Sequence, residues 1–443
     1  MENLTFHNKD LRQSKRMQCM KNIDYYVNTT ELHREKRLNQ RGKAVDISDA
    51  GIGIETDYPL APGHMLWLNG EIDKAGVVRW CMKVNNNYRA GIKLDANGDL
   101  NKLRAEEPKG DMFVREETEK YSDFLDRATN RFNKQLNDIE ERCRDRKENP
   151  EEILKAIEMA VEEVLSVCAE FEQGVKDRDT IQNARTEFHR KTNPILSKSH
   201  HINRTRTWPQ GSQGDYKTLE LVYKNMPLSE GIGYYLDLFA LNLPLGEGVR
   251  NRIKKLEGML RDETAKRQKP SILNIACGSC RELMGLVPEI SDSNAKVICI
   301  DNDNDALAFA QNRLSYTEIL PQVEFRKYNA IRMFDDETNM IEFGKQDVIY
   351  SVGLFDYLPD DFLVKLLRAL YNLLNPGGKL IAAFKDANRY RSQAYHWLLD
   401  WDGFLQRTED DFNSLLHKAG IPAANTSETR EESGIIIFYV ATK

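Results

Sequence analysis

The feature that most constrains this chain is an alternation of strand and helix patterns that begins near residue 216 and continues to the end of the sequence. Short apolar runs recur along this stretch, and helical patterns separate most of them. The runs are SILNIAC, KVICID, VEFRKYN, DVIYSVG, KLIAAF and IIIFYVA. Strands that alternate with helices are typical of parallel sheets with helical crossovers. Residues 193–443 are therefore expected to form an α/β Rossmann-like domain with a helical lead-in.

Residues 1–105 carry a different pattern, with short alternating apolar stretches punctuated by Gly and Pro. The stretches are KAVDIS, GIGIE, HMLWLNGEI, GVVRWCMKV and YRAGIKL. Strands of this length and spacing predict a small all-β barrel. The chain is thus expected to be multidomain, with the barrel at its N-terminal end.

Residues 111–192 contain almost no Gly or Pro, and apolar residues between Leu154 and Val175 recur in steps of three and four. This spacing predicts a helical seam, and Asn149-Pro150 is typical of a helix start. We expect two long helices folded into a hairpin; the alternative is a coiled coil that joins two copies into a homodimer. Residues 192–215 are polar and are expected to be a linker or a loop over an active site, with His200 and His201 in solvent.

Charge and composition exclude several classes of protein. The net charge is −6, which argues against a globally basic nucleic-acid binder. No apolar run approaches the roughly 18 residues that a membrane helix needs. The seven cysteines are odd in number and scattered, so a disulfide framework is not expected. These observations predict a cytoplasmic protein without a metal centre, a nucleic-acid partner or a membrane span.

The first chemical motif lies near the N-terminus, where Arg12 and Arg16 form R-x-x-x-R and are followed by Asp46, Ser48 and Gly51 in D-x-S-x-x-G. Together these motifs resemble the PilZ domain, a bacterial receptor for cyclic di-GMP. The chemistry suits that ligand, because arginine forks match phosphates and guanine edges and a carboxylate can accept from guanine N–H groups. The resemblance implies that these five residues bind cyclic di-GMP. The alternative is a solvated basic arm beside an ordinary turn.

The second motif joins an apolar strand to a turn with a single glycine, Gly278, and places Asp301 23 residues later, after the next strand. An acid at this distance suits the hydroxyls of a ribose at the strand ends. The turn lacks the G-x-G-x-x-G pattern, which favours a cofactor without phosphates over a dinucleotide.

This arrangement resembles the class I S-adenosylmethionine-dependent methyltransferases. The resemblance implies S-adenosyl-L-methionine as cofactor, held by residues at the ends of four strands. These residues are Ala276, Cys277, Gly278, Asp301, Asn302, Asn329, Ala330 and Ser351. Asn329 stands where the family often has an acid, and the turn ACGSC lacks a common second glycine. Cys277 and Cys280 are expected to be loop residues rather than a redox pair.

A narrower resemblance covers most of residues 210–443 and rests on the segments GDYKTLELVY, VRNRIKKL, ACGSCRE, GLFDYLPDD and WLLDW followed by RT. In these segments the chain resembles methyltransferases that make 3-hydroxypalmitic acid methyl ester. The resemblance implies a fatty-acid-like carboxylate, a small-molecule or lipid acceptor, that needs a cation to orient it. The candidates at the acceptor are Tyr357, Arg389 and Arg391. Trp397, Trp401 and Phe404 are expected in the core rather than in an acyl-chain groove.

These observations predict a cyclic di-GMP-responsive methyltransferase. The alternative function is an adaptor that binds cyclic di-GMP and uses a catalytically degenerate methyltransferase-like domain to dock a protein partner. The altered glycine turn and Asn329 are the residues that keep this alternative open.

Overall fold

The structure is a computed structural model, and it describes most of the chain. The described residues are 17–31, 34–48, 51–58, 60, 65–69, 74–84, 87–94, 112–144 and 148–443. They divide into two compact units, one that contains the N-terminal strands and one that contains the C-terminal sheet.

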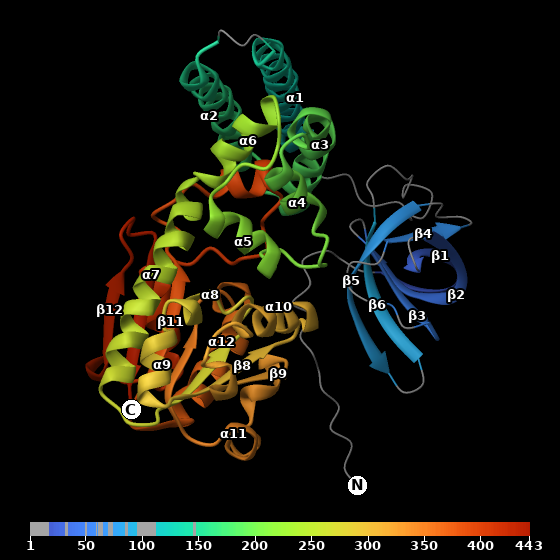
Figure 1. Cartoon of the computed structure of the whole chain (residues 1–443). Helices are drawn as coiled ribbons and strands as arrows, with labels where there is room; N and C mark the ends of the chain where they lie inside the picture. Colours follow the sequence, from blue (N-terminus) through green and yellow to red (C-terminus); the bar gives the residue numbers. More distant parts are fainter. Residues whose placement is uncertain are drawn as a thin grey trace. The chain divides into compact units, whose positions relative to one another are not determined.

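The N-terminal strands form a closed antiparallel barrel in the order β1-β2-β3-β6-β5-β4 (Figure 1). The strands are β1 Met17–Glu31, β2 Arg34–Ser48, β3 Gly51–Thr56, β4 Met65–Asn69, β5 Lys74–Val84 and β6 Asn87–Leu94. Alternate side chains fill the interior, among them Tyr25, Ile52 and Val78. The alternating pattern predicted such a barrel, although it did not mark the long strand β1.

Four helices follow the barrel. They are α1 Met112–Arg142, α2 Pro150–Gly174, α3 Arg178–Leu196 and α4 His200–Thr207. Helices α1 and α2 run antiparallel (Figure 1), and Gln135 Nε2 donates to Glu163 between them at 3.0 Å. Asn149 caps α2, because its side chain accepts from the Glu151 N–H at 3.0 Å.

The hairpin expected from the sequence is present, but the chain adds the third helix α3. The prediction for residues 192–215 was wrong in part, because α3 and α4 extend through much of a segment expected to be a linker or loop. His201 is buried rather than solvated. The polar helix α4 had no clear apolar period, since it contributes only a few residues to the core.

Three further helices lead into the C-terminal sheet: α5 Tyr216–Lys224, α6 Ile232–Leu241 and α7 Pro244–Ala265. Asp215 begins α5 by accepting from the Lys217 and Thr218 N–H groups. Arg204 holds the Asp215 carboxylate at 2.6 Å, which fixes the entry of the chain into the sheet domain. The predicted helical lead-in is therefore present.

The C-terminal sheet has seven strands in the order β12-β13-β11-β10-β7-β8-β9, with helices on both faces (Figure 1). The strands are β7 Ser271–Ile275, β8 Lys296–Asp301, β9 Val323–Lys327, β10 Gln346–Ser351, β11 Leu374–Lys385, β12 Thr426–Arg430 and β13 Ile436–Thr442. The α-helices between them are α8 Arg281–Met284, α9 Val287–Ser293, α10 Asn304–Leu314, α11 Asp336–Phe343, α12 Asp360–Asn372 and α13 Glu409–Lys418. Shorter helical turns are Leu320–Gln322, Ala330–Phe334, Phe355–Tyr357, Ala394–Leu398 and Ala423–Asn425.

Strands β9, β8, β7, β10 and β11 are parallel, whereas β13 is antiparallel to β11 and β12 to β13. The sheet is therefore mixed and not wholly parallel, a detail that strand patterns do not reveal. The order reverses between β7 and β10. Ligands of open α/β sheets bind at such a switch point, outside the carboxyl ends of the strands.

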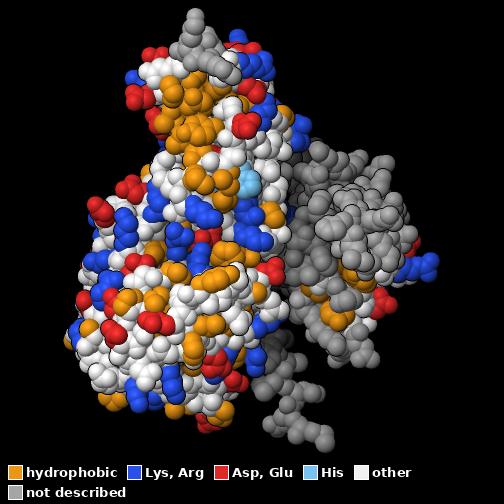
Figure 2. All heavy atoms as spheres, viewed as in Figure 1, with side chains coloured by type: hydrophobic (Ala, Val, Ile, Leu, Met, Phe, Trp, Pro, Cys, Tyr) orange, Lys and Arg blue, Asp and Glu red, His pale blue; other side chains and the backbone are white. Residues whose placement is uncertain are grey.

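The sequence argued against a globally basic nucleic-acid binder and against a membrane-spanning helix, and the structure provides one observation on each. On the visible face of the C-terminal unit, acidic side chains are interspersed among the basic ones (Figure 2). Among the described residues, every helix is too short or too polar to cross a bilayer.

Candidate functional site

The turn after β7 lies at the switch point and has an unusual backbone. Ala276, Gly278 and Cys280 have φ values of +53°, +54° and +46°. Two of these residues are not glycine, so the left-handed conformation costs free energy that the surrounding fold must supply. The Cys280 N–H donates to the Cys277 carbonyl at 3.0 Å and closes the turn. The result is a tight loop between β7 and α8.

Asp301, at the end of β8, lies directly beside this turn. Its Oδ2 accepts from the Gly278 N–H at 2.8 Å, and its Oδ1 accepts from the Asp303 N–H at 2.9 Å. Burial raises the pKa of Asp301 from its ordinary value. Each carboxylate oxygen has a second lone pair, so the pair can still accept from two neighbouring hydroxyl groups. The predicted glycine and acid are therefore in contact.

The other expected cofactor residues lie at the ends of the same strands. Asn302 and Asn329 are exposed after β8 and β9, and Ala330 follows. The Asn329 side chain accepts from the Ile331 N–H at 3.1 Å and begins a helical turn. The structure places the Ser351 hydroxyl inside the sheet instead, where it is buried and donates to the Ile275 carbonyl at 2.9 Å.

Helix α5 holds the turn from the other side through Glu220. This buried carboxylate accepts from Ser279 Oγ at 2.7 Å and pairs with Arg281 at 3.0 Å and Arg313 at 2.6 Å. Burial opposes ionisation, but hydrogen bonds from Arg313 and Ser279 outweigh it and lower the pKa of Glu220. The sequence analysis missed Glu220, because nothing in its own helix reveals a partner 59 residues away.

A pocket lies between the lead-in helices and the ends of β10 and β11. Its walls are mainly apolar, with contributions from α5, α6, α7 and the segment after β11. The apolar lining residues are Leu219, Val222, Ala240, Leu245, Val249, Leu399 and Trp401.

The polar groups in this pocket are basic or neutral. Arg252 and Lys385 line it and are buried, and no lining residue is acidic. Lys385 forms an ion pair with Asp356, and burial lowers the pKa of Lys385. The carboxylate of Asp356 is therefore paired with Lys385 and not with Arg252. His201 is also buried here, and burial lowers its pKa to about 4, so it is neutral at pH 7.

Arg252 is held only by neutral acceptors among the described residues. Its guanidinium donates to the Val352 carbonyl and to Tyr223 Oη, the latter at 3.2 Å, while its buried Nε has no hydrogen-bond partner there. The guanidinium lies beside Gly353, directly after β10. A buried cation in this setting favours an anionic ligand.

Tyr357, one of the residues predicted at the acceptor, lines the same pocket. Its hydroxyl accepts from Trp401 Nε1 at 2.8 Å, and burial raises the pKa of Tyr357. Gly214 lies against both, since a Cβ there would be 2.8 Å from Tyr357 Oη and from Trp401 Cζ2. Trp397 and Phe404 are buried, whereas Trp401 faces the pocket.

Arg389 and Arg391 lie elsewhere. Arg391 pairs with Glu162 at 2.6 Å, and the exposed Arg389 lies 3.8 Å from Asp386. Neither lines the pocket. Arg252 and Lys385 are the cations that line the pocket, and the sequence analysis missed both. Arg252 lies within helix α7, and Lys385 ends the apolar strand β11, so neither position indicated a binding site.

Only part of the N-terminal motif lies within the described residues. Arg12 and Arg16 lie outside the described residues. Asp46 and Ser48 are buried on β2, and Gly51 begins β3 opposite Ser48. The motif's strand residues therefore share one end of the β2–β3 pair.

The Asp46 carboxylate is oriented by its neighbours. Arg89 NH2 donates to Asp46 Oδ2 at 3.3 Å. A Cβ at Gly53 would lie only 2.5 Å from Asp46 Oδ1, so a side chain there would have to displace the Asp46 carboxylate. The Asp46 carboxylate therefore lies against Gly53 of β3 and is held there by Arg89.

Comparison with known families decides the class of the C-terminal domain. Residues 272–378 match a family model described as a methyltransferase domain. This region is a methyltransferase domain of the S-adenosylmethionine-dependent class. The glycine turn and Asp301 of this methyltransferase domain fall within the matched residues, and they fit a nucleoside that offers ribose hydroxyls.

Solved structures resemble the chain at low identity. It is similar to a possible exported protein from Bordetella parapertussis, with 18% identity over 58% of this chain and 88% of that chain, and a TM-score of 0.46. It is also similar to magnesium protoporphyrin IX methyltransferase from Synechocystis PCC 6803 with bound SAM, with 16% identity, 46% and 84% coverage, and a TM-score of 0.33. No curated protein matches the sequence. Both likenesses are distant.

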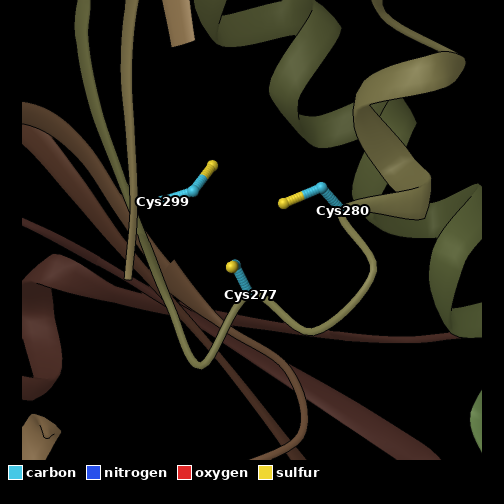
Figure 3. Close-up of side chains that lie close together, drawn as sticks. All are labelled: Cys277, Cys280 and Cys299. Carbon is cyan, nitrogen blue, oxygen red and sulfur yellow. The ribbon is translucent and has the colours of Figure 1, made fainter. Parts of the chain in front are cut away.

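Three cysteines of the methyltransferase domain form a cluster beneath the cofactor turn (Figure 3). The side chains of Cys277, Cys280 and Cys299 are buried, and their sulfur atoms all lie within 4.8 Å of one another. Hydrogen bonds from Cys280 and Cys299 lower the pKa of the Cys277 thiol. Among the described residues, this is the one group of three or more His, Cys, Asp or Glu side chains that lie close enough together to hold a metal ion.

Proposed function

We propose that this chain transfers the methyl group of S-adenosylmethionine to the carboxylate of an amphiphilic, fatty-acid-like acceptor. The observation that carries the proposal is Arg252, a buried guanidinium held by neutral acceptors in an apolar pocket without acidic lining residues. Apolar walls suit an acyl chain, and the cation suits its carboxylate.

The chemistry demands little of the protein beyond positioning. Bound S-adenosylmethionine supplies a methyl group already activated on a sulfonium. Asp301 accepts hydrogen bonds from the ribose hydroxyls, and Arg252 orients the acceptor carboxylate. A carboxylate needs no general base, so positioning and the exclusion of water by the apolar walls provide the catalysis.

The acceptor class is tested with labelled cofactor and a panel of carboxylic acids. We expect labelled methyl esters from long-chain fatty acids, including 3-hydroxy acids, and much less product from short-chain acids of equal charge. Lipids and small molecules from a cell extract serve as the open panel. Labelled product only on amines, phenols or protein would contradict a carboxylate acceptor, and no product despite cofactor binding would favour the adaptor.

The role of Arg252 is tested with Arg252→Met. We expect kcat/KM for the acid to fall about ten- to a hundredfold, because a charge-assisted hydrogen bond contributes about 1.5–3 kcal/mol. Cofactor affinity, measured by calorimetry, should stay within about twofold. The matched control is Lys254→Met, which removes an exposed cation from the same helix. An equal loss in both variants would contradict the assignment.

We also propose that cyclic di-GMP binds the N-terminal barrel and regulates methyl transfer. The R-x-x-x-R and D-x-S-x-x-G motifs support this proposal, together with the oriented carboxylate of Asp46 beside Arg89. Arg12 and Arg16 are the residues expected to bind the phosphates and guanine bases.

This regulation is tested by measuring methyl transfer with and without cyclic di-GMP. The wild type and Arg12→Ala/Arg16→Ala are compared under both conditions, and calorimetry reports binding. We expect binding and a rate change in the wild type alone. Equal rates in all four conditions would contradict regulation.

A further inference from the structure

The cysteine cluster brings together two segments of the methyltransferase domain. Cys277 and Cys280 come from the β7–α8 turn, and Cys299 comes from the adjacent strand β8. In Figure 3 the three sulfur atoms point toward a common space, with two side chains from the loop and one from the strand. All three residues are free of disulfide bonds.

The spacing of the sulfur atoms suits a shared metal ion. Metal–thiolate bonds of about 2.3 Å place the sulfur atoms of a trigonal or tetrahedral site about 4 Å apart. The cluster, with all sulfur atoms within 4.8 Å, would contract by less than about 1 Å. Cys280 has a left-handed backbone, and its side chain points toward Cys277 and Cys299 (Figure 3).

The donor set selects the class of ion. Three thiolates are soft ligands, which favour Cu⁺ and Zn²⁺ over Mg²⁺ or Ca²⁺. Within the described part of the chain, no histidine, aspartate, glutamate or fourth cysteine completes the group. Two polar groups contact the cluster: the Gly278 carbonyl lies 3.9 Å from Cys277 Sγ, and Asn274 Nδ2 lies 4.0 Å from Cys280 Sγ.

We propose that Cys277, Cys280 and Cys299 form a binding site for one thiophilic d¹⁰ metal ion, Cu⁺ or Zn²⁺. The ion cross-links the turn that carries Gly278 to the strand that carries Asp301. Because Gly278 and Asp301 are also joined by a hydrogen bond, the metal stabilises the same junction from below. The site shares Cys277 with the residues expected to hold the cofactor, but it does not depend on the proposed acceptor.

The test uses the whole chain, reduced and freed of metal, and supplied with Cu⁺ or Zn²⁺ under nitrogen. Elemental analysis after dialysis should find about one ion per chain in the wild type, and bound ion should raise the thermal midpoint. Cys299→Ala should bind less than a tenth as much. Cys143→Ala removes a half-buried thiol outside the cluster and should bind like the wild type.

A second measurement needs no variant. The wild type is alkylated in mild urea with and without the metal, and each cysteine is followed by mass spectrometry. The metal should protect Cys277, Cys280 and Cys299 and leave Cys81 and Cys143 unchanged. Absence of binding by both ions, equal binding by Cys299→Ala, equal protection of all cysteines or a disulfide within the cluster would overturn the proposal.

Discussion

At the scale of residues, the walls of the pocket are packed so closely that one added methyl group would displace a neighbouring side chain. Gly214 has a φ of +70° and sits against Tyr357 and Trp401. Arg252, Lys385 and their neighbours set the charge of the same pocket. Small changes here are expected to affect acceptor binding before they affect folding.

Gly214→Ala is expected to reduce kcat/KM for the acceptor at least about tenfold. The added Cβ would lie 2.8 Å from Tyr357 Oη and must displace it or Trp401. The control is Gly377→Ala, which has a similar φ of +74° but open space around its Cβ. Both variants should lose about 1 kcal/mol of stability from backbone strain, but only the first should lose activity. Steady-state kinetics and urea unfolding distinguish the two, and equal kinetics would contradict the role of Gly214.

His201 should make stability depend on pH. Burial lowers its pKa to about 4, whereas an unfolded histidine titrates near 6.5. As the pH falls through this window the unfolded state binds a proton that the folded state does not. The stabilising contribution is therefore complete above about pH 6.5 and is lost as the pH falls toward 4.

The pH effect is measured as the free energy of unfolding in urea. His201→Gln should lose less stability than the wild type between about pH 7.5 and 4.5. The control His417→Gln changes an exposed histidine and should keep the wild-type slope. If the free energy of unfolding of His201→Gln changed with pH as steeply as that of the wild type, the titration of His201 would not contribute to the pH dependence of stability.

At the scale of elements, helix α5 and the β7–α8 turn act as one unit. Glu220 holds Ser279, Arg281 and Arg313 at once, so its charge positions a turn on another element. This makes Glu220 a positioning residue for the cofactor site.

Glu220→Gln should weaken cofactor binding by about tenfold, because the amide cannot satisfy two arginines. Calorimetry measures this affinity, and circular dichroism checks that the fold is kept. The control Glu247→Gln changes an exposed acid at the start of α7. Wild-type affinity in the Glu220 variant, with the fold intact, would contradict the positioning role.

The elements also show where sequence patterns succeed. Six of the seven strands of the sheet were visible as apolar runs, because most of these strands lie inside the sheet and are largely hydrophobic, although the edge strand β9 has only Val323 buried. The polar edge strand β12 was not visible, since its side chains are largely exposed. The polar helix α4 was missed for a related reason, because most of its eight residues are polar and only part of one face is buried.

At the scale of the whole molecule, the chain has two compact units, and each has its own hydrophobic core. Units of this kind need not unfold together. Ligands that bind different units should therefore stabilise different transitions.

Differential scanning calorimetry should show two transitions. S-adenosylmethionine at about 100 times its Kd should stabilise one unit by about 2.7 kcal/mol, and cyclic di-GMP should do the same for the other. Arg12→Ala/Arg16→Ala should abolish only the second effect. A cyclic di-GMP shift confined to the transition that S-adenosylmethionine also moves would contradict binding at the barrel.

The sequence by itself determined the barrel, the α/β alternation and the positions of Gly278 and Asp301 after two successive strands. Those features follow from local periodicity and from adjacent parallel strands, whose ends must meet at one edge. Tertiary structure alone decided that Arg252, Lys385 and His201 share a pocket while Arg389 and Arg391 do not, and that Cys299 joins Cys277 and Cys280. Such groups come from elements far apart in the sequence, and only packing brings their side chains within reach of one another.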